Sequence, residues 1–179
     1  AEAVEAAKKA DYVIFVGGMN KAHNQDCEDG DRLHYELPYG QDQLISTLAA
    51  VNDKVVFVSI SGNAHGMPWS QEVGAILQAW YSGSETGHAV ADVLFGDVNP
   101  SGKLPYTIQP TLADYPAHQY GEVAYPGVDK QVYYKEDIFV GYRYADLYGT
   151  RRPIKYVSQG EQYTINPPKR KALFPFGFG

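Results

Sequence analysis

Five acidic side chains stand between residues 26 and 36 with a single Lys or Arg among them. The acids are Asp26, Glu28, Asp29, Asp31 and Glu36, and the base is Arg32. Repulsion among crowded carboxylates favours protonation, and a general acid needs a protonated carboxyl group. The residues alone leave three interpretations open: a general acid, a metal-binding loop or a solvated acidic loop. The metal interpretation is the weakest, because the spacing differs from the Asp-x-Asp-x-Asp-Gly calcium loop.

Other motifs for chemistry are incomplete. The stretch that begins at Gly17 lacks the G-x-G-x-x-G dinucleotide pattern, and no phosphate-binding loop motif occurs. Ser61 is not in a G-x-S-x-G context, which disfavours an independent esterase-like α/β enzyme. The histidines show no metal-ligand spacing, although His23 and His65 fall in loops where a polar surface role and a binding role are both open. We therefore predict neither a metal site nor a cofactor.

The elements that must position these residues alternate along the chain. Short apolar runs at 12–16 and 55–60 end in glycine or serine, which is typical of buried parallel strands. The run at 75–80 is compatible with helix or strand, and we expect a short helix leading into a strand. Three ranges, 1–10, 41–51 and 85–95, show either helical spacing of apolar residues or good helix formers. This alternation predicts an α/β fold with a mainly parallel sheet and helices on both faces.

Ligands of open parallel sheets bind outside the carboxyl ends of the strands. The loops after residues 16, 60 and 80 are therefore the candidates, and the acidic stretch belongs to the first. Trp69 and Trp80 lie near the same edge, where aromatic faces suit sugar rings. We favour core packing for both tryptophans.

The overall composition excludes several classes of protein. The chain has 179 residues, a formal net charge of −6 and 44% apolar residues, which is typical of one globular domain. An acidic chain is a poor candidate for nucleic-acid binding, and no apolar run approaches the ~18 residues of a membrane span. Cys27 is the single cysteine, so no internal disulfide forms. The amino-acid composition changes after residue 110, where 10 of the 15 tyrosines lie. We expect one domain, with a regular α/β part at 1–110 and an irregular Tyr/Pro-rich extension at 111–179.

Several longer motifs carry a resemblance to a known family. Residues 80–87 read W-Y-S-G-S-E-T-G, and residues 91–105 read A-D-V-L-F-G-D-V-N-P-S-G-K-L-P. Both resemble conserved blocks of glycoside hydrolase family 3. Further similar segments are D-R…L-P…Q at 31–41, S-G-N…P-W at 61–69, I-F-V-G-Y-R-Y at 138–144 and F-P-F-G-F-G at 174–179. The resemblance covers nearly the whole chain.

The resemblance implies the C-terminal α/β sandwich domain of a retaining exo-β-glycosidase, with β-glucosidase as the leading activity. In this family an N-terminal barrel domain holds the nucleophilic aspartate, and the sandwich domain lends the acid/base glutamate. No segment here matches the barrel, so the chain alone is expected to be incomplete and inactive. Substrates would be β-linked glucosides or related oligosaccharides, without a cofactor. The family also implies a secreted or periplasmic protein, although this chain shows no signal peptide.

The acidic stretch can be compared with the family pattern E-x-E-G-x-D-R. Here the stretch from Asp26 reads D-C-E-D-G-D-R, which places Glu28 at the second glutamate. Glu28 is therefore the candidate acid/base, with Asp26 and Asp29 as alternates. Asp31 and Arg32 are expected to support the loop. The glycine of the pattern is displaced by one position.

Residues before the acidic stretch are candidates for substrate contacts. His23, Asn20 and Met19 would line the aglycone side, and His65 is a weaker candidate at the rim. The alternative function is a non-catalytic carbohydrate-binding or scaffolding module. The preference for gluco- or xylo-substrates and the oligomeric state stay open at this point.

Overall fold

A computed structural model describes residues 1–22, 25–28, 32–158 and 160–179. The chain divides into two compact units, Ala1–Pro100 and Ser101–Gly179. The regular α/β elements lie in the first unit, and the second consists mainly of turns and short elements. No helix in the described residues is long and apolar enough to cross a membrane.

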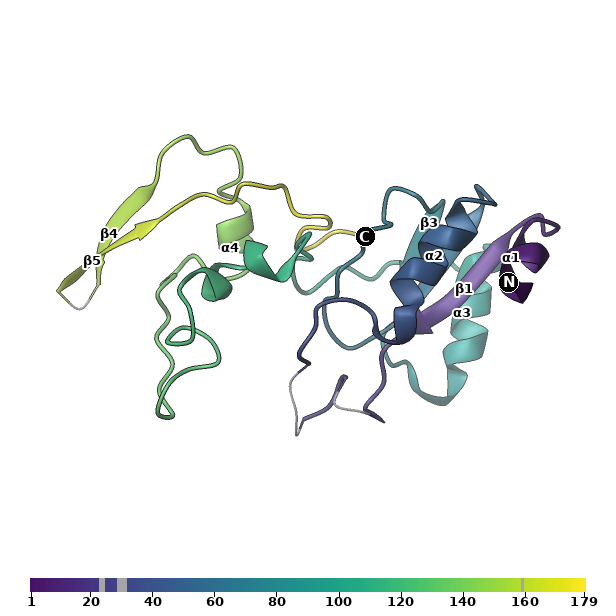
Figure 1. Cartoon of the computed structure of the whole chain (residues 1–179), viewed down its shortest axis with the longest axis horizontal. Helices are drawn as coiled ribbons and strands as arrows, with labels where there is room; N and C mark the ends of the chain where they lie inside the picture. The colour runs from purple at the N-terminus through teal and green to yellow at the C-terminus, as the bar shows by residue number, and fades with distance from the viewer. Residues whose placement is uncertain (23–24, 29–31, 159) are drawn as a thin grey trace. The chain divides into compact units, whose positions relative to one another are not determined.

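The first unit is built around a parallel sheet in the order β1-β2-β3. Its strands are β1 (Val13–Gly18), β2 (Val55–Ile60) and β3 (Ala75–Gln78), of which β1 and β3 are labelled in Figure 1. In the register, Phe57 of β2 lies beside Phe15 of β1 and Ile76 of β3. The predicted α/β fold with a mainly parallel sheet is confirmed, and the strand expected at 55–60 has these bounds.

The expected short helix before β3 does not form. Residues 67–72 instead make successive tight turns, with backbone bonds from Ser70 N to Met67 O and from Glu72 N to Trp69 O. Gly74 N then donates to Val55 O at 2.8 Å, which brings the chain onto the edge of β2. Pairing with β2 supplies backbone partners at once, whereas a single helical turn is costly to nucleate.

Three α-helices accompany the sheet. They are α1 (Glu2–Ala7), α2 (Gln41–Ala49) and α3 (Thr86–Phe95), and a 3-10 turn, η3 (Gly83–Glu85), precedes α3. Ala7, Leu48 and Val55 form a buried cluster that joins α1, α2 and β2. The α2 helix contacts β1 and β2, and α3 lies behind the sheet in Figure 1. The three predicted helices are confirmed, each with a shorter span.

Strand β1 is less buried than its apolar run predicted. Val13 and Phe15 pack toward the core cluster, but Ile14 is 46% and Val16 61% exposed. Within the described residues β1 pairs with β2 alone, so it is an edge strand with one uncovered face. The central strand β2 fits the expectation, since Val55, Phe57 and Val58 are fully buried.

The second unit contains short elements and one hairpin. The elements are η4 (Leu112–Asp114), η5 (Pro116–Gln119), α4 (Tyr142–Ala145) and the antiparallel strands β4 (Ile154–Ser158) and β5 (Glu161–Ile165). Tyrosine hydroxyls bond to the backbone here, as in the bond from Tyr156 to Lys135 O at 2.7 Å. The stacked rings of Tyr156 and Tyr163 lie on the hairpin, 5.4 Å apart. The sequence interpretation missed this hairpin.

Candidate active site

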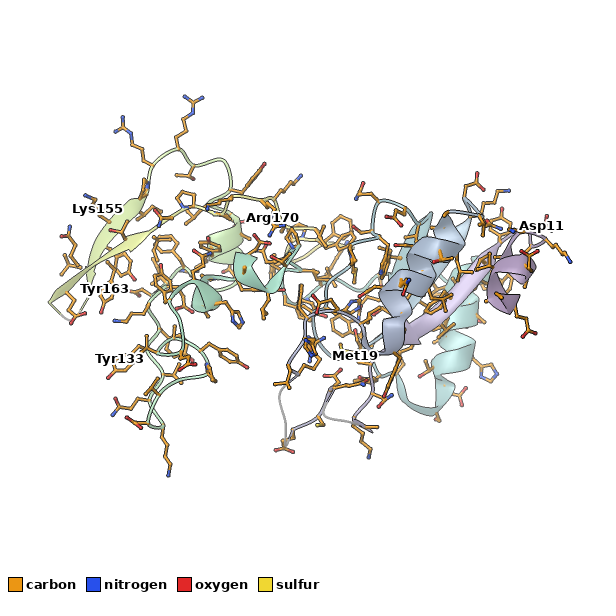
Figure 2. All side chains as sticks on the ribbon, in the orientation of Figure 1. Asp11, Met19, Tyr133, Lys155, Tyr163 and Arg170 are labelled. Carbon is orange, nitrogen blue, oxygen red and sulfur yellow. The ribbon has the colours of Figure 1, made fainter. Side chains whose placement is uncertain are left out.

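The three loops that follow β1, β2 and β3 leave the same edge of the sheet because the strands are parallel. The longest runs from Met19, shown in Figure 2 at the end of β1, to Gly40, immediately before α2. This loop carries the acidic stretch. The other two loops begin at Ser61 and Ala79.

The base of the first loop is closed by Gln41. Its Nε2 donates to Gly18 O at 2.8 Å and to Pro38 O at 3.0 Å, and its Oε1 accepts from Gly18 N at 2.8 Å. Gly18 has a φ of +132°, and a Cβ there would lie 2.1 Å from Ile60 O. Only glycine fits this position, so the start of the loop is set by contact with β2.

Asp26 connects the first loop to the other two. Its Oδ2 accepts hydrogen bonds from Gly62 N at 2.7 Å and from the Tyr81 hydroxyl at 2.6 Å. Its Oδ1 accepts from Asn63 Nδ2 at 2.7 Å. A Cβ on Gly62 would lie 3.1 Å from Asp26 Oδ2 and 3.0 Å from the Tyr81 ring, so glycine permits this close approach. Both oxygens of Asp26 are thus occupied by donors.

Arg32 holds the far end of the acidic stretch. Its Nη2 donates to Asn63 Oδ1 at 2.8 Å and to Ala64 O at 2.6 Å, and its Nη1 approaches Met19 Sδ at 2.8 Å. Asn63 therefore contacts Asp26 through its amide nitrogen and Arg32 through its amide oxygen. We call Asp26, Arg32, Gly62, Asn63 and Tyr81 the edge clamp.

Burial, reinforced by the hydrogen bond to Asp26, raises the pKa of the Tyr81 hydroxyl well above its usual value. The hydroxyl consequently stays protonated and remains a donor to Asp26 throughout the neutral range. The Met19 carbonyl oxygen also lies 3.2 Å from this hydroxyl, so the start of the first loop is near the same point.

Glu28 differs from Asp26 although only one residue separates them. Its side chain is exposed, and no hydrogen bond or ion pair joins it to any residue that the structure describes. Asp29 and Asp31 lie outside the described residues, so the acids of the stretch can be compared only at Asp26, Glu28 and Glu36. Glu28 and Glu36 are both exposed, whereas Asp26 is engaged by donors.

His65 lies in a second polar cluster, which shares the loop after β2 with the edge clamp. Its Nδ1 lies 2.9 Å from Gly66 O, and since a carbonyl only accepts, Nδ1 carries the proton. Its Nε2 then accepts from Ser59 Oγ at 3.0 Å, and Ser61 Oγ lies 3.1 Å from Ser59 Oγ. Gln78 Nε2 donates to Ser61 Oγ at 3.0 Å. We call these four side chains, of residues 59, 61, 65 and 78, the dry network.

Three of the four residues of the dry network are shielded from water, and Gln78 is partly buried. Ser59, Ser61 and His65 are fully buried, and burial lowers the pKa of His65 below its ordinary 6.5. The imidazole is therefore neutral at pH 7 and serves internal hydrogen bonds. These surroundings give His65 a structural role within the domain. A contact of His65 with substrate at the rim stays a prediction.

The remaining candidates for substrate contacts differ in how far they are exposed. Met19 is buried, with 4% of its surface exposed, and Asn20 is exposed, with Oδ1 accepting from Ala22 N at 2.7 Å. His23 lies outside the described residues. Trp69 is fully buried, donates from Nε1 to Asp42 Oδ1 at 2.7 Å and packs against Phe57, so it belongs to the core as favoured above.

Sequence reasoning did not assign a role to Gly62, Asn63 or Tyr81. Each lies in a motif that the sequence shows, immediately after a strand, but their partner Asp26 is 36 or more residues away. The strand-end position was the available signal. The described residues contain no group of three or more His, Cys, Asp or Glu side chains that could hold a metal ion.

A parallel α/β unit with an acidic loop held at its carboxyl edge defines a class of domain that can present a carboxyl group to a ligand. Comparison with known proteins makes the class specific: residues 1–142 match the glycosyl hydrolase family 3 C-terminal domain. The chain belongs to glycosyl hydrolase family 3, as its C-terminal domain. The family predicted from the motifs is confirmed.

The similar proteins are β-glucosidases. The chain is 51% identical over 178 residues to beta-glucosidase BoGH3A of Bacteroides ovatus, covering 99% of this chain and 21% of that protein. Among solved structures it resembles the Kluyveromyces marxianus β-glucosidase in complex with glucose, with a TM-score of 0.80 and 35% identity, over 99% of this chain and 18% of that one. It also resembles DesR, a Streptomyces venezuelae β-glucosidase in complex with D-glucose, with a TM-score of 0.76 and 32% identity over 88% of this chain and 22% of that one. The chain thus spans about a fifth of the length of these relatives.

Proposed function

We propose that this chain is the acid/base-bearing domain of a retaining exo-β-glycosidase that acts on β-glucosides. A barrel domain of the complete enzyme would supply the nucleophilic aspartate, and this chain alone would be inactive. The observation that supports the proposal most directly is the contrast within the acidic stretch. Asp26 is engaged by three donors, while Glu28 is exposed on the same anchored loop.

A retaining glycosidase needs two carboxyl groups about 5–5.5 Å apart across the scissile bond. One attacks the anomeric carbon, and the other protonates the leaving oxygen and later takes a proton from water. The second group must face the substrate and exchange protons with it. Glu28 and Glu36 both meet this condition, and of the two Glu28 matches the second glutamate of the family pattern, whereas both oxygens of Asp26 already accept hydrogen bonds.

A loop residue suits this role for a geometric reason. The acid/base must reach across a domain boundary to a nucleophile on another domain, and the loop after β1 extends beyond the sheet edge. Its base is closed by Gln41 and its middle is tied by Asp26, so the reach comes with a defined position. Positioning of this kind accounts for a large share of enzymatic rate enhancement.

The test is Glu28→Ala in the complete enzyme. Loss of a general acid should lower kcat/KM by roughly 10²–10⁴-fold for alkyl glucosides, whose leaving groups need protonation. Dinitrophenyl glucoside, whose leaving group departs unprotonated, should retain glycosylation at nearly the parent rate. Added azide should restore turnover and yield glucosyl azide, because it replaces the water that Glu28 would activate.

Two matched variants serve as controls. Glu36→Ala removes an exposed acid from the same loop and should leave the leaving-group dependence unchanged. Asp29→Asn tests the remaining alternate carboxylate. If Glu28→Ala slows both substrates equally and azide has no effect, Glu28 is not the acid/base. Glycosidase activity of the 179-residue chain alone would contradict the proposed need for a barrel domain.

A further inference from the structure

Two side chains of the edge clamp come from residues that flank Glu28 in the sequence. Asp26 precedes this segment and Arg32 follows it, and both side chains bond to the same residue, Asn63, on the loop after β2. The bond lengths are 2.7 Å to Asp26 and 2.8 Å to Arg32. One amide side chain therefore joins Asp26 and Arg32 to the loop after β2.

The chemistry of the three groups makes Asn63 specific. A carboxylate only accepts hydrogen bonds and a guanidinium only donates them. A side chain between the two must offer a donor on one side and an acceptor on the other at nearly the same point. The primary amide of asparagine does this, and neither Asp nor Leu of similar size could.

The two-residue spacing limits how far Glu28 can lie from Asp26. Glu28 follows Asp26 by two residues, so its Cα can lie no more than ~7 Å from the Cα of Asp26. If the clamp opened, the carboxyl group of Glu28 could move by several ångströms. A displacement of ~1 Å from productive geometry can cost about a hundredfold in rate.

The clamp contributes more to position than to stability. Asn63 and Gly62 are exposed, and hydrogen bonds at such positions contribute little to the free energy of folding. A loop can thus be displaced without unfolding of the domain. A positional role and a structural role can be separated by experiment for this reason.

We propose that Asn63 is a positioning residue for the acid/base, which holds the Glu28 segment in place through Asp26 and Arg32. The proposal rests on the proposed function of Glu28. Asn63 touches neither substrate nor reacting atoms in this scheme. It acts by matching the hydrogen-bonding character of the two groups that flank the acid/base.

The experiment exchanges the donor and the acceptor. Asn63→Asp is nearly isosteric and keeps an acceptor for Arg32, but it places a carboxylate against the carboxylate of Asp26. Asp26→Asn places an amide nitrogen against that of Asn63 and keeps an oxygen for Gly62 N and Tyr81. The double variant Asp26→Asn/Asn63→Asp restores a donor opposite an acceptor at every contact.

In the complete enzyme, each single variant should lower kcat for an alkyl glucoside by roughly 10–100-fold with little change in KM. Dinitrophenyl glucoside should lose less than about threefold in glycosylation, because that step does not need the acid. The double variant should recover the alkyl rate to within about fivefold of the parent, as expected for a coupled pair. A loss through misfolding would instead affect both substrates equally and would not be rescued.

Cys27 gives a second readout that is independent of catalysis. It is the single cysteine of the chain and is partly exposed, between Asp26 and Glu28. Thiol labelling at Cys27, measured by peptide mass spectrometry with Cys27→Ser as the blank, should be about tenfold faster in both single variants and return to the parent rate in the double variant.

The outcomes separate the two proposals. If Glu28→Ala shows the acid/base signature while the single clamp variants keep the alkyl rate within twofold, the role of Asn63 is overturned and that of Glu28 stands. If Glu28→Ala lacks the signature, the proposed function fails and the positioning role falls with it. Unchanged Cys27 labelling in the single variants would also overturn the clamp itself.

Discussion

Two polar clusters occupy the carboxyl edge of the same sheet, and they differ in nearly every physical respect. The edge clamp is charged and largely exposed, with Asp26 and Arg32 at its ends. The dry network is neutral and mostly buried, with His65 at its centre and Gln78 partly exposed. Both attach to the loop after β2, through Asn63 in one case and through Ser61 and His65 in the other.

The difference indicates which cluster should stabilise the first unit and which should determine the position of the loop after β1. A buried polar group that loses its partner keeps its desolvation penalty, at about 1–3 kcal/mol. An exposed group that loses its partner is solvated by water instead. Damage to the dry network should therefore destabilise the first unit, whereas damage to the edge clamp should move a loop.

The largest expected effect on stability is that of His65→Ala. This change leaves Ser59 and Gly66 O without their partner and opens a cavity, so the free energy of unfolding should fall by roughly 2–4 kcal/mol. Denaturant unfolding followed by tryptophan fluorescence measures this, since both tryptophans lie in the first unit. The matched clamp variant Asn63→Ala should lose less than about 1 kcal/mol. Equal losses would remove the distinction between the two clusters.

The second effect is on the pH dependence of stability. Because the pKa of His65 is lowered in the folded chain, its imidazole becomes protonated below pH 6.5 in the unfolded chain but stays neutral in the folded chain. Stability from this residue is present above pH 6.5 and is lost on acidification, by up to about 1.4 kcal/mol per pH unit. His65→Asn should flatten the slope of unfolding free energy between pH 6.5 and 5. The exposed His34→Asn serves as the control, and an equal slope in the parent and His65→Asn would contradict the prediction.

The third effect concerns the glycine at the clamp. A Cβ on Gly62 would lie 3.0 Å from the Tyr81 ring, so Gly62→Ala should push the Tyr81 and Asp26 side chains apart at a cost of about 1 kcal/mol. Labelling of Cys27 should accelerate in this variant. Gly87→Ala is the matched control, since no atom outside its chain neighbours and the backbone of α3 lies within 4 Å of that Cβ. It should stabilise the helix by about 0.5–1 kcal/mol, so a shared destabilisation would argue against a specific contact.

The smallest expected effect is that of Tyr81→Phe. The hydroxyl donates to Asp26 at 2.6 Å, but Tyr81 is 50% exposed, so water can take over this bond. The free energy of unfolding should change by about 0.5 kcal/mol. Cys27 labelling should rise less than in Asn63→Asp, because two donors to Asp26 remain. A larger rise than in Asn63→Asp would assign the main anchor to Tyr81.

The sequence predicted most of the first unit, because local patterns determined it. The apolar run at 55–60 and the helical spacing at 41–51 each specify an element without information from the rest of the chain. The sequence-based prediction was wrong before β3, where the chain forms turns and pairs with β2 in place of the expected helix. It also missed the β4–β5 hairpin, whose strands gain stability only by pairing with each other.

The candidate site was predictable only in part for a similar reason. The acidic stretch and the strand-end loops are visible as residue types, and the family motifs pointed to Glu28. The partners of Asp26 were not visible, because Gly62 and Tyr81 are separated from it by 36 and 55 residues. Sequence spacing carries no signal for a contact of that range.

By itself, the sequence determined the family, the parallel α/β architecture and the position of an acidic loop after the first strand. Those properties follow from periodicity and motifs, which act over a few residues. Only the tertiary structure decided which carboxylate is engaged and which is exposed. That distinction depends on three parallel strands ending at one edge, where Asp26 meets donors from two other loops and Glu28 meets none among the described residues.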